Sequence, residues 1–309
     1  MKVKKVLIVL LLVLYVVPVF ACDICGCGVG SYYIGILPEF KKRFIGLRYQ
    51  QKGLLTHISP SGSTSYLTTN ETYRTMELWG AMNFGSRFRV LGFVPVNTIA
   101  RVNQGISSQK SGLGDVAFVG YFKLFNSSSI LKSNKLLVHS LWMGGGVKLP
   151  TGKYNPAEKN IDQLQQNTFQ LGTGSLDFTF NAMYDIRIMD LGINSNISYK
   201  LNTRNKYDYL YGNKFTGNIL AYYKFNIQNK ITVAPNFGFL YEKATNDWND
   251  ANSIVKASGG YSNMFSSGIE LNYKDISLGG NYQSPLSQNL SGNTVKAKDR
   301  FMVHVSLSL

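Results

Sequence analysis

The residues best placed to do chemistry are three cysteines near the start of the chain, in the sequence Cys22-Asp23-Ile24-Cys25-Gly26-Cys27. They are all the cysteines of the protein. Three thiolates at this C-x-x-C-x-C spacing can converge on a soft ion such as Cu(I) or Zn(II), because the glycine lets the backbone fold round the metal. Cys22, Cys25 and Cys27 are therefore candidate metal ligands.

Two other kinds of chemistry fit the same cysteines. The sequence Val19-Phe20-Ala21-Cys22 resembles a lipoprotein cleavage box, in which Cys22 would carry a lipid and leave Cys25 and Cys27. In an oxidising compartment, two of the three thiols could form a disulfide and leave the third free. Metal binding, lipidation and disulfide formation all stay open.

The histidines do not suggest an enzyme. His57, His139 and His304 are isolated in the sequence and accompany no nucleophile motif. The run Gly144-Gly145-Gly146 is not followed by the strand-to-helix transition that a phosphate-binding loop needs. We therefore expect no catalytic residues.

The segment before the cysteines predicts export. Lys2, Lys4 and Lys5 precede an uncharged run over residues 6–20, and Ala21 is a small residue suited to cleavage. Residues 1–21 are thus a predicted signal peptide, and residues 22–42 a cysteine-containing periplasmic segment. Its aromatic and apolar part, residues 28–40, could enter a barrel from below. The thiols would then lie at the periplasmic mouth, where they could gate a pore or pass a metal to a periplasmic carrier.

The charge of the chain excludes one class of partner. The formal net charge is +15, but the lysines and arginines are spread along the sequence. A nucleic-acid site needs basic residues concentrated on one face, so we expect no nucleic-acid binding. Attraction to anionic lipid headgroups or to anionic solutes accounts better for the charge.

The rest of the chain alternates between apolar and polar residues. Residues 190–202, 264–274 and 300–309 show the pattern most clearly, and their charged residues all fall on the polar face. Twelve such segments are predicted, at residues 43–52, 71–84, 87–96, 113–125, 135–149, 175–186, 190–201, 214–226, 230–242, 263–274, 275–284 and 300–309.

The connections between these segments alternate in length. Short turns are expected at 85–86, 126–134, 187–189, 227–229 and 274–275, and longer polar loops at 53–70, 97–112, 150–174, 202–213, 243–262 and 285–299. Short turns on one side and long loops on the other are typical of outer-membrane barrels. Residues 43–309 therefore predict an all-β, antiparallel up-and-down transmembrane barrel of about twelve strands in a Gram-negative outer membrane. Its partners would be outer-membrane lipids, the barrel-insertion machinery and a small solute.

The polar face of the strands predicts the lumen. The candidate lumen and selectivity residues are Arg48, Glu77, Arg89, Asp115, Asp177 and Glu270. These charges could select solutes, or they could simply pair with one another inside the barrel. Twelve strands lie between the filled barrels of about 8 strands and the open porins of about 16, so we expect a narrow or plugged pore.

Three glycine-rich stretches carry a family resemblance. They are Ser111-Gly112-Leu113-Gly114-Asp115, then residues 144–152 (GGGVKLPTG), then Leu171-Gly172-Thr173-Gly174-Ser175. They resemble the bacterial outer-membrane barrels assigned to the phenol-degradation meta-pathway as transporters, over much of residues 40–309. The resemblance implies a channel-like barrel.

The sequence thus favours a porin-like transporter of small solutes, with hydrophobic or aromatic molecules among the candidates. A metal-handling barrel that binds copper or zinc through the cysteines is the alternative. A purely structural or adhesive barrel, with its determinants in loops such as 150–174 and 243–262, is a third hypothesis.

Overall fold

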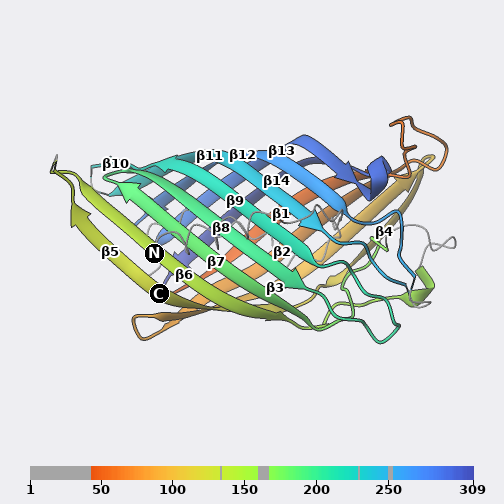
Figure 1. The fold of residues 1–309 in the computed structure, drawn as a ribbon, viewed down its shortest axis with the longest axis horizontal. Helices are drawn as coiled ribbons and strands as arrows, with labels where there is room; N and C mark the ends of the chain where they lie inside the picture. Colours follow the sequence, from red (N-terminus) through yellow and green to blue (C-terminus); the bar gives the residue numbers. More distant parts are fainter. Residues whose placement is uncertain (1–42, 133, 159–166, 229, 250–252) are drawn as a thin grey trace, which may run out of the picture.

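The computed structural model describes residues 43–309, except 133, 159–166, 229 and 250–252. These residues form a closed antiparallel barrel of twelve strands with almost no helix (Figure 1). The predicted all-β barrel is therefore confirmed. The predicted signal peptide and the segment that holds Cys22, Cys25 and Cys27 lie outside the described residues.

The strands follow the predicted segments in order. They are β1 (Phe44–Thr56), β2 (Thr69–Phe84), β3 (Phe88–Asn103), β4 (Ile106–Leu113), β5 (Ala117–Ile130), β6 (Leu136–Lys148), β7 (Asp177–Ile188), β8 (Leu191–Leu201), β9 (Lys214–Tyr223), β10 (Phe225–Ile227), β11 (Ile231–Ala244), β12 (Gly260–Tyr273), β13 (Ile276–Leu290) and β14 (Lys296–Ser308). Two short 3-10 helices, η1 (Pro156–Glu158) and η2 (Ser291–Asn293), lie in connections.

Apart from β4 with β5 and β9 with β10, strands that are consecutive in the sequence pair with each other, and β1 pairs with β14 to close the barrel. Two barrel strands are interrupted. β4 and β5 both pair with β3 and are separated at residues 114–116, and β9 and β10 both pair with β11 and are separated at Lys224. The first interruption matters for the lumen, because it places Asp115 between two strand segments.

Several predicted loops are strand instead. The expected loops at 97–112 and 285–299 are largely taken up by extensions of β3, β13 and β14 and by β4, whereas the expected loop at 53–70 is shortened to residues 57–68. The expected turn at 126–134 also begins later, because β5 continues to Ile130. These extensions carry polar residues on both faces, as in β4 (ISSQKSGL). Without an apolar face they show no alternation, so the sequence pattern does not predict them as strand.

Burial alternates along the strands as the sequence alternates. In β14, Met302, His304 and Ser306 are buried, and the residues between them, such as Val303 and Val305, are exposed. The outward residues of the other strands include many exposed phenylalanines, leucines and isoleucines. No helix among the described residues is long and apolar enough to cross a membrane.

An apolar exterior on a closed sheet is the arrangement that a bilayer requires of strands, because every backbone donor and acceptor is paired within the wall. The barrel is therefore an outer-membrane protein of a Gram-negative bacterium. The short turns gather at one end of the barrel and the long connections at the other (Figure 1). Short turns mark the periplasmic end in such barrels.

Candidate functional site

The six predicted lumen residues are all buried inside the barrel. Arg48, Glu77, Arg89, Asp115, Asp177 and Glu270 are each less than 5% exposed. They do not form one site. The structure divides them among separate groups, and the group that holds Asp115 and Asp177 also contains residues of the connection between β6 and β7, here called loop 149–176.

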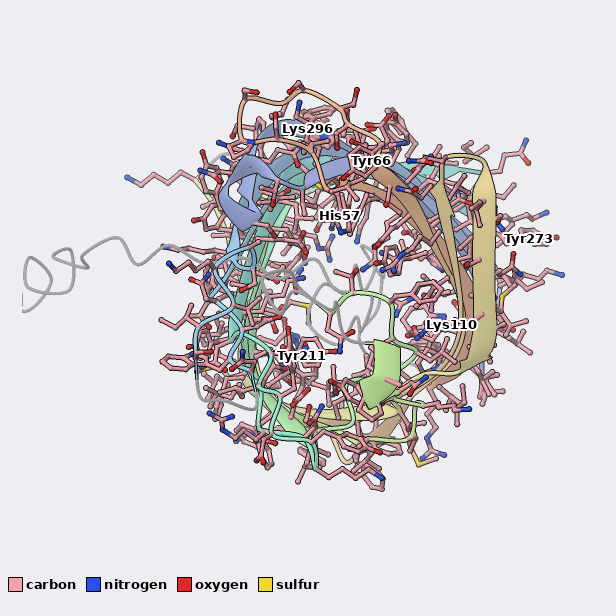
Figure 2. The ribbon with its side chains drawn as sticks, turned by 90° about the vertical axis from the view of Figure 1, so that its right-hand side faces the viewer. His57, Tyr66, Lys110, Tyr211, Tyr273 and Lys296 are labelled. Carbon is pink, nitrogen blue, oxygen red and sulfur yellow. The ribbon has the colours of Figure 1, made fainter. Side chains whose placement is uncertain are left out.

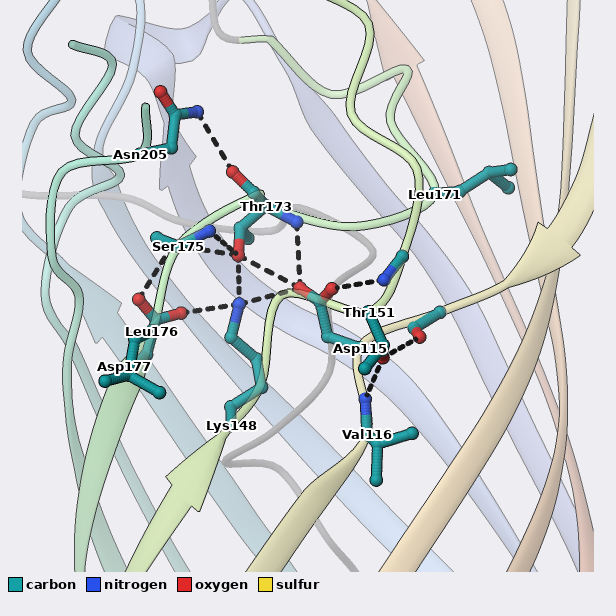
Figure 3. A network of polar contacts seen from close by, with 12 residues as sticks. Asp115, Val116, Lys148, Thr151, Leu171, Thr173, Ser175, Leu176, Asp177 and Asn205 are labelled. Atoms are coloured by element: carbon teal, nitrogen blue, oxygen red, sulfur yellow. Dashed lines mark hydrogen bonds and ion pairs between the residues drawn. The ribbon is translucent and has the colours of Figure 1, made fainter. Parts of the chain in front are cut away.

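The first group joins the two ends of this loop to the barrel wall (Figure 3). Lys148 Nζ lies 2.7 Å from Asp115 Oδ2 and 2.7 Å from Asp177 Oδ2, and Lys200 Nζ lies 4.0 Å from Asp177 Oδ2. Lys148 also donates to the hydroxyl of Thr173. We call Asp115, Lys148, Thr173 and Asp177 the Lys148 network.

Backbone groups of the loop complete this network. The N–H of Gly152 donates to Asp115 Oδ1 over 2.9 Å, and the N–H of Thr173 donates to Asp115 Oδ2 over 2.8 Å. A Cβ on Gly152 would lie 2.8 Å from the Cα of Gly172 and 3.0 Å from Asp115 Oδ1. Glycine at these positions therefore lets two stretches of backbone close around one carboxylate, which explains two of the glycine-rich stretches in the sequence.

The loop residues Thr168 and Phe169 are held by a second group on the wall. Glu71 Oε1 lies 2.9 Å from Arg101 Nη2, and Glu71 Oε2 accepts hydrogen bonds from the hydroxyls of Tyr73 and Thr168. The ring of Phe169 lies against Arg101, whose guanidinium carbon is 4.5 Å from its centroid. The loop is thus anchored at both its ends and at Thr168 and Phe169.

These contacts place the loop within the barrel and not above it. Leu171 packs in one apolar cluster with inward residues from opposite sides of the barrel. The members of the cluster are Leu54, Tyr73, Ile99, Leu171, Leu240, Met264, Leu290 and Ala297. Figure 2 looks into the barrel from the long-loop end and shows the green η1 within the outline of the ring of strands, and Figure 1 places η1 at that end of the barrel. The long polar loop predicted at 150–174 is therefore present, at residues 149–176. Its residues Thr168 and Thr173 are buried and form hydrogen bonds with lumen carboxylates.

Two further connections pack beside this loop through tyrosines. The hydroxyl of Tyr209 donates to Asp247 Oδ2 over 2.6 Å, and the hydroxyl of Tyr211 donates to the carbonyl of Asn167 over 3.2 Å. Tyr154 stacks on Tyr207 with ring centroids 5.4 Å apart. The long-loop end is thus closed partly by residues 202–213 and 245–259.

The short-turn half of the lumen combines aromatic rings with charges. Arg48 forms an ion pair with Glu77, and its guanidinium carbon lies 5.1 Å from the centroid of Trp79 and 5.5 Å from that of Phe93. Arg89 lies similarly over Phe44, at 5.5 Å. These rings belong to a larger inward cluster of Phe44, Trp79, Ala81, Leu91, Phe93, Ala117, Val119, Tyr121, Trp142 and Met183.

Glu270 meets His304 on the same face. His304 Nε2 lies 3.1 Å from Glu270 Oε1, and the two side chains are 1% and 0% exposed. The two residues lie on β12 and β14, and Gly279 of β13 is directly between them in register. The contact exists because Gly279 has no side chain: a Cβ there would overlap both groups.

The other two histidines show no catalytic arrangement. His139 faces outward between Phe125 and Tyr184, with ring centroids 5.2 and 6.3 Å away. His57 Nδ1 lies 3.0 Å from the hydroxyl of Thr56. No group of three or more histidines, cysteines, aspartates or glutamates that could hold a metal occurs among the described residues. The three cysteines fall outside them, so their predicted role in metal binding stays a prediction.

Lys148 and Glu71, two lumen residues with several ion-pair and hydrogen-bond partners, are not among the residues predicted from the sequence. Lys148 ends an alternating segment, and its parity alone would have placed it inward. Glu71 begins such a segment and has the same parity as Glu77. Thr168 and Thr173 could not be found in this way, because they lie in a loop without periodicity.

We expect Glu71 to hold the part of the loop around Thr168 in place. In Glu71→Gln, the ion pair with Arg101 is lost and the hydrogen bonds from Tyr73 and Thr168 no longer reach a charged acceptor. Hydrogen bonds to charged groups contribute about 1.5–3 kcal/mol each. We expect the loop to be cleaved faster by a protease added to the folded barrel. Thr72→Ser, at the adjacent outward position, should leave the cleavage rate unchanged; equal rates in both variants would contradict the anchor.

Comparison with known proteins supports the fold. No protein-family profile matches the sequence, and no curated protein is detectably similar to it in sequence. The crystal structure of an outer membrane channel from Pseudomonas putida is similar over 91% of this chain and 100% of that chain, with a TM-score of 0.60 and 12% identity. The beta domain of a Bordetella autotransporter covers 87% of this chain and 100% of its own, with a TM-score of 0.52 and 8% identity.

At such low identity the likeness concerns the architecture alone. Both proteins are outer-membrane barrels, in agreement with the coarser part of the resemblance seen in the sequence. The finer resemblance, to the transporters of the phenol-degradation meta-pathway, stays a prediction. The structure thus gives a membrane barrel with a charged, aromatic interior and a loop anchored within it.

Proposed function

We propose that this protein is an outer-membrane channel for small solutes in which loop 149–176 narrows the pore. The observation that carries the proposal is the position of this loop. Its two ends are tied to the inner wall at β5–β7 by the Lys148 network, and Thr168 is tied to β2 by Glu71. A purely structural or adhesive barrel has no need of a loop held inside its lumen.

The lining of the short-turn half supports a class of solute. Trp79 and Phe93 face the interior beside the guanidinium of Arg48, and Tyr121 and Trp142 extend the same aromatic surface. Aromatic faces stack on apolar rings, and a guanidinium attracts anions or stacks on a ring. We therefore infer that small solutes with an aromatic or apolar part pass through. The likeness to an outer membrane channel is consistent with this proposal.

Solute flux into liposomes tests both parts of the proposal. The reconstituted full chain should admit benzoate and the sugar arabinose faster than protein-free liposomes do, with benzoate preferred. Replacing Trp79 and Phe93 by leucine should reduce this preference, because the stacking faces are lost. Phe180→Leu changes an outward ring that is 58% exposed, and should have no effect.

The two parts fail in different ways. No flux of either solute above the protein-free rate would contradict the channel itself. Flux with equal rates for benzoate and arabinose would contradict only the aromatic preference and leave the channel in place.

A further inference from the structure

A groove of about 910 Å³ opens on the barrel wall near its short-turn end. It is lined by Arg43, Phe44, Ile45, Leu78, Trp79, Gly80, Ala81, Met82, Asn83, Gly85, Val90, Gly92 and Leu309. Its side-chain ridges are Ile45, Leu78 and Met82, which all project outward and are 47%, 45% and 52% exposed. The groove therefore faces the bilayer and not the lumen.

Two glycines form the floor of the groove. Gly80 on β2 and Gly92 on β3 are directly opposite each other in the strand pairing, and both are at outward positions. At these two glycines the barrel wall therefore lacks the outward side chains that the neighbouring positions carry. A recess of this kind leaves the atoms of its lining without partners unless something apolar fills it.

The rim of the groove carries positive charge. Arg43 is the charged residue of the lining, and it is exposed at the start of β1. Its backbone is fixed, because its carbonyl accepts a hydrogen bond from the N–H of Leu309 over 2.8 Å. Arg87, exposed in the turn between β2 and β3, adds a second positive charge at the same end of these strands.

We propose that this groove binds an anionic phospholipid of the periplasmic leaflet, with one acyl chain lying on Gly80 and Gly92 and the phosphate at Arg43. The apolar ridges match a hydrocarbon chain, and an arginine forms strong charge-assisted hydrogen bonds with a phosphate. A second copy of this chain fits less well. A twofold interface would bring Arg43 of each copy close to the same positive rim of the other, since such an interface repeats one patch on both partners.

Lipid binding to the purified full chain tests the proposal. We would measure it by native mass spectrometry with two probes, phosphatidylglycerol and phosphatidylcholine with the same acyl chains. The wild type should bind phosphatidylglycerol more tightly. Arg43→Gln should lower its affinity for phosphatidylglycerol by about fivefold, the effect of one basic residue at an anionic surface, and leave phosphatidylcholine unchanged. Gly92→Leu fills the groove and should weaken both lipids.

Matched variants separate the groove from general effects. Gly145→Leu also adds a side chain at an outward glycine, where the nearest atom to a Cβ is 3.6 Å away, but it lies outside the groove. Lys132→Gln removes a positive charge from another short turn. Both should bind lipids as the wild type does. All variants would first be checked for the heat-modifiable gel mobility of a folded barrel.

Three results would overturn the proposal. The first is wild-type lipid affinity in both Arg43→Gln and Gly92→Leu. The second is a loss confined to Arg43→Gln, which would mean that the headgroup binds without the acyl chain in the groove. The third is a dimer in the wild type that Gly92→Leu abolishes, which would make a second copy of the chain the occupant.

Discussion

In Lys148→Met, the single-channel conductance of the reconstituted barrel should rise several-fold over that of the wild type. Lys148 lies between Asp115 and Asp177, and the three side chains are at most 2% exposed. Methionine keeps most of the volume but removes the cation, so Asp115 loses its ion-pair partner and Asp177 keeps only Lys200, whose ammonium group is 4.0 Å away. Removing one partner of a buried ion pair costs about 3–5 kcal/mol.

Most of this cost can be avoided if the loop leaves the lumen. Asp115 binds the backbone N–H groups of Gly152 and Thr173 at the two ends of loop 149–176. When the loop moves out, water can reach both carboxylates, and the barrel strands themselves need not separate. The expected result is therefore a wider pore in a barrel that is still folded.

Two further variants test this explanation. In the double variant Asp115→Asn/Lys148→Met the remaining carboxylate, Asp177, keeps Lys200 as its partner at 4.0 Å, so the conductance should return toward the wild-type value. Lys200→Met removes a lysine whose ammonium group is farther from Asp177, at 4.0 Å, and should have a smaller effect than Lys148→Met. A folded Lys148→Met barrel with wild-type conductance would show that the loop does not limit the current.

The sequence predicts which residues face the lumen better than it predicts which of those residues contact one another. Alternation alone places Arg48 and Glu77 on the inner face. Their ion pair depends on the register of β1 and β2, in which the two residues are directly opposite. Register follows from hydrogen bonding between strands, which no single segment of sequence contains.

The position of loop 149–176 could not be predicted for a different reason. Thr168 and Thr173 are polar, as in a solvated loop, yet both are buried and hydrogen-bonded. A polar side chain can be buried at low cost when the surrounding wall supplies partners. Those partners, Glu71 and Asp115, lie 97 and 58 residues away in the chain. The cysteine cluster differs from the loop, because the hypothesis that it binds a metal still rests on the spacing of the cysteines alone.

Gly279→Ala should destabilise the barrel strongly, although it adds a single methyl group. The new Cβ would overlap His304 Nε2 and both carboxylate oxygens of Glu270. Overpacking of this kind costs about 1–3 kcal/mol, and separation of the buried pair costs about 3–5 kcal/mol. We expect a lower urea concentration at the midpoint of unfolding, followed by the loss of heat-modifiable gel mobility.

The neighbouring glycine provides the control. Gly280→Ala makes the same chemical change one residue later, at a position on the opposite face where the nearest atom to a Cβ is 3.8 Å away. Its effect should stay within about 0.5 kcal/mol, as for most surface substitutions. In a background of Glu270→Ala and His304→Ala the obstacle is gone, so Gly279→Ala should cost little there. If Gly279→Ala and Gly280→Ala shift the midpoint equally, the contact between Glu270 and His304 does not depend on the missing side chain at position 279.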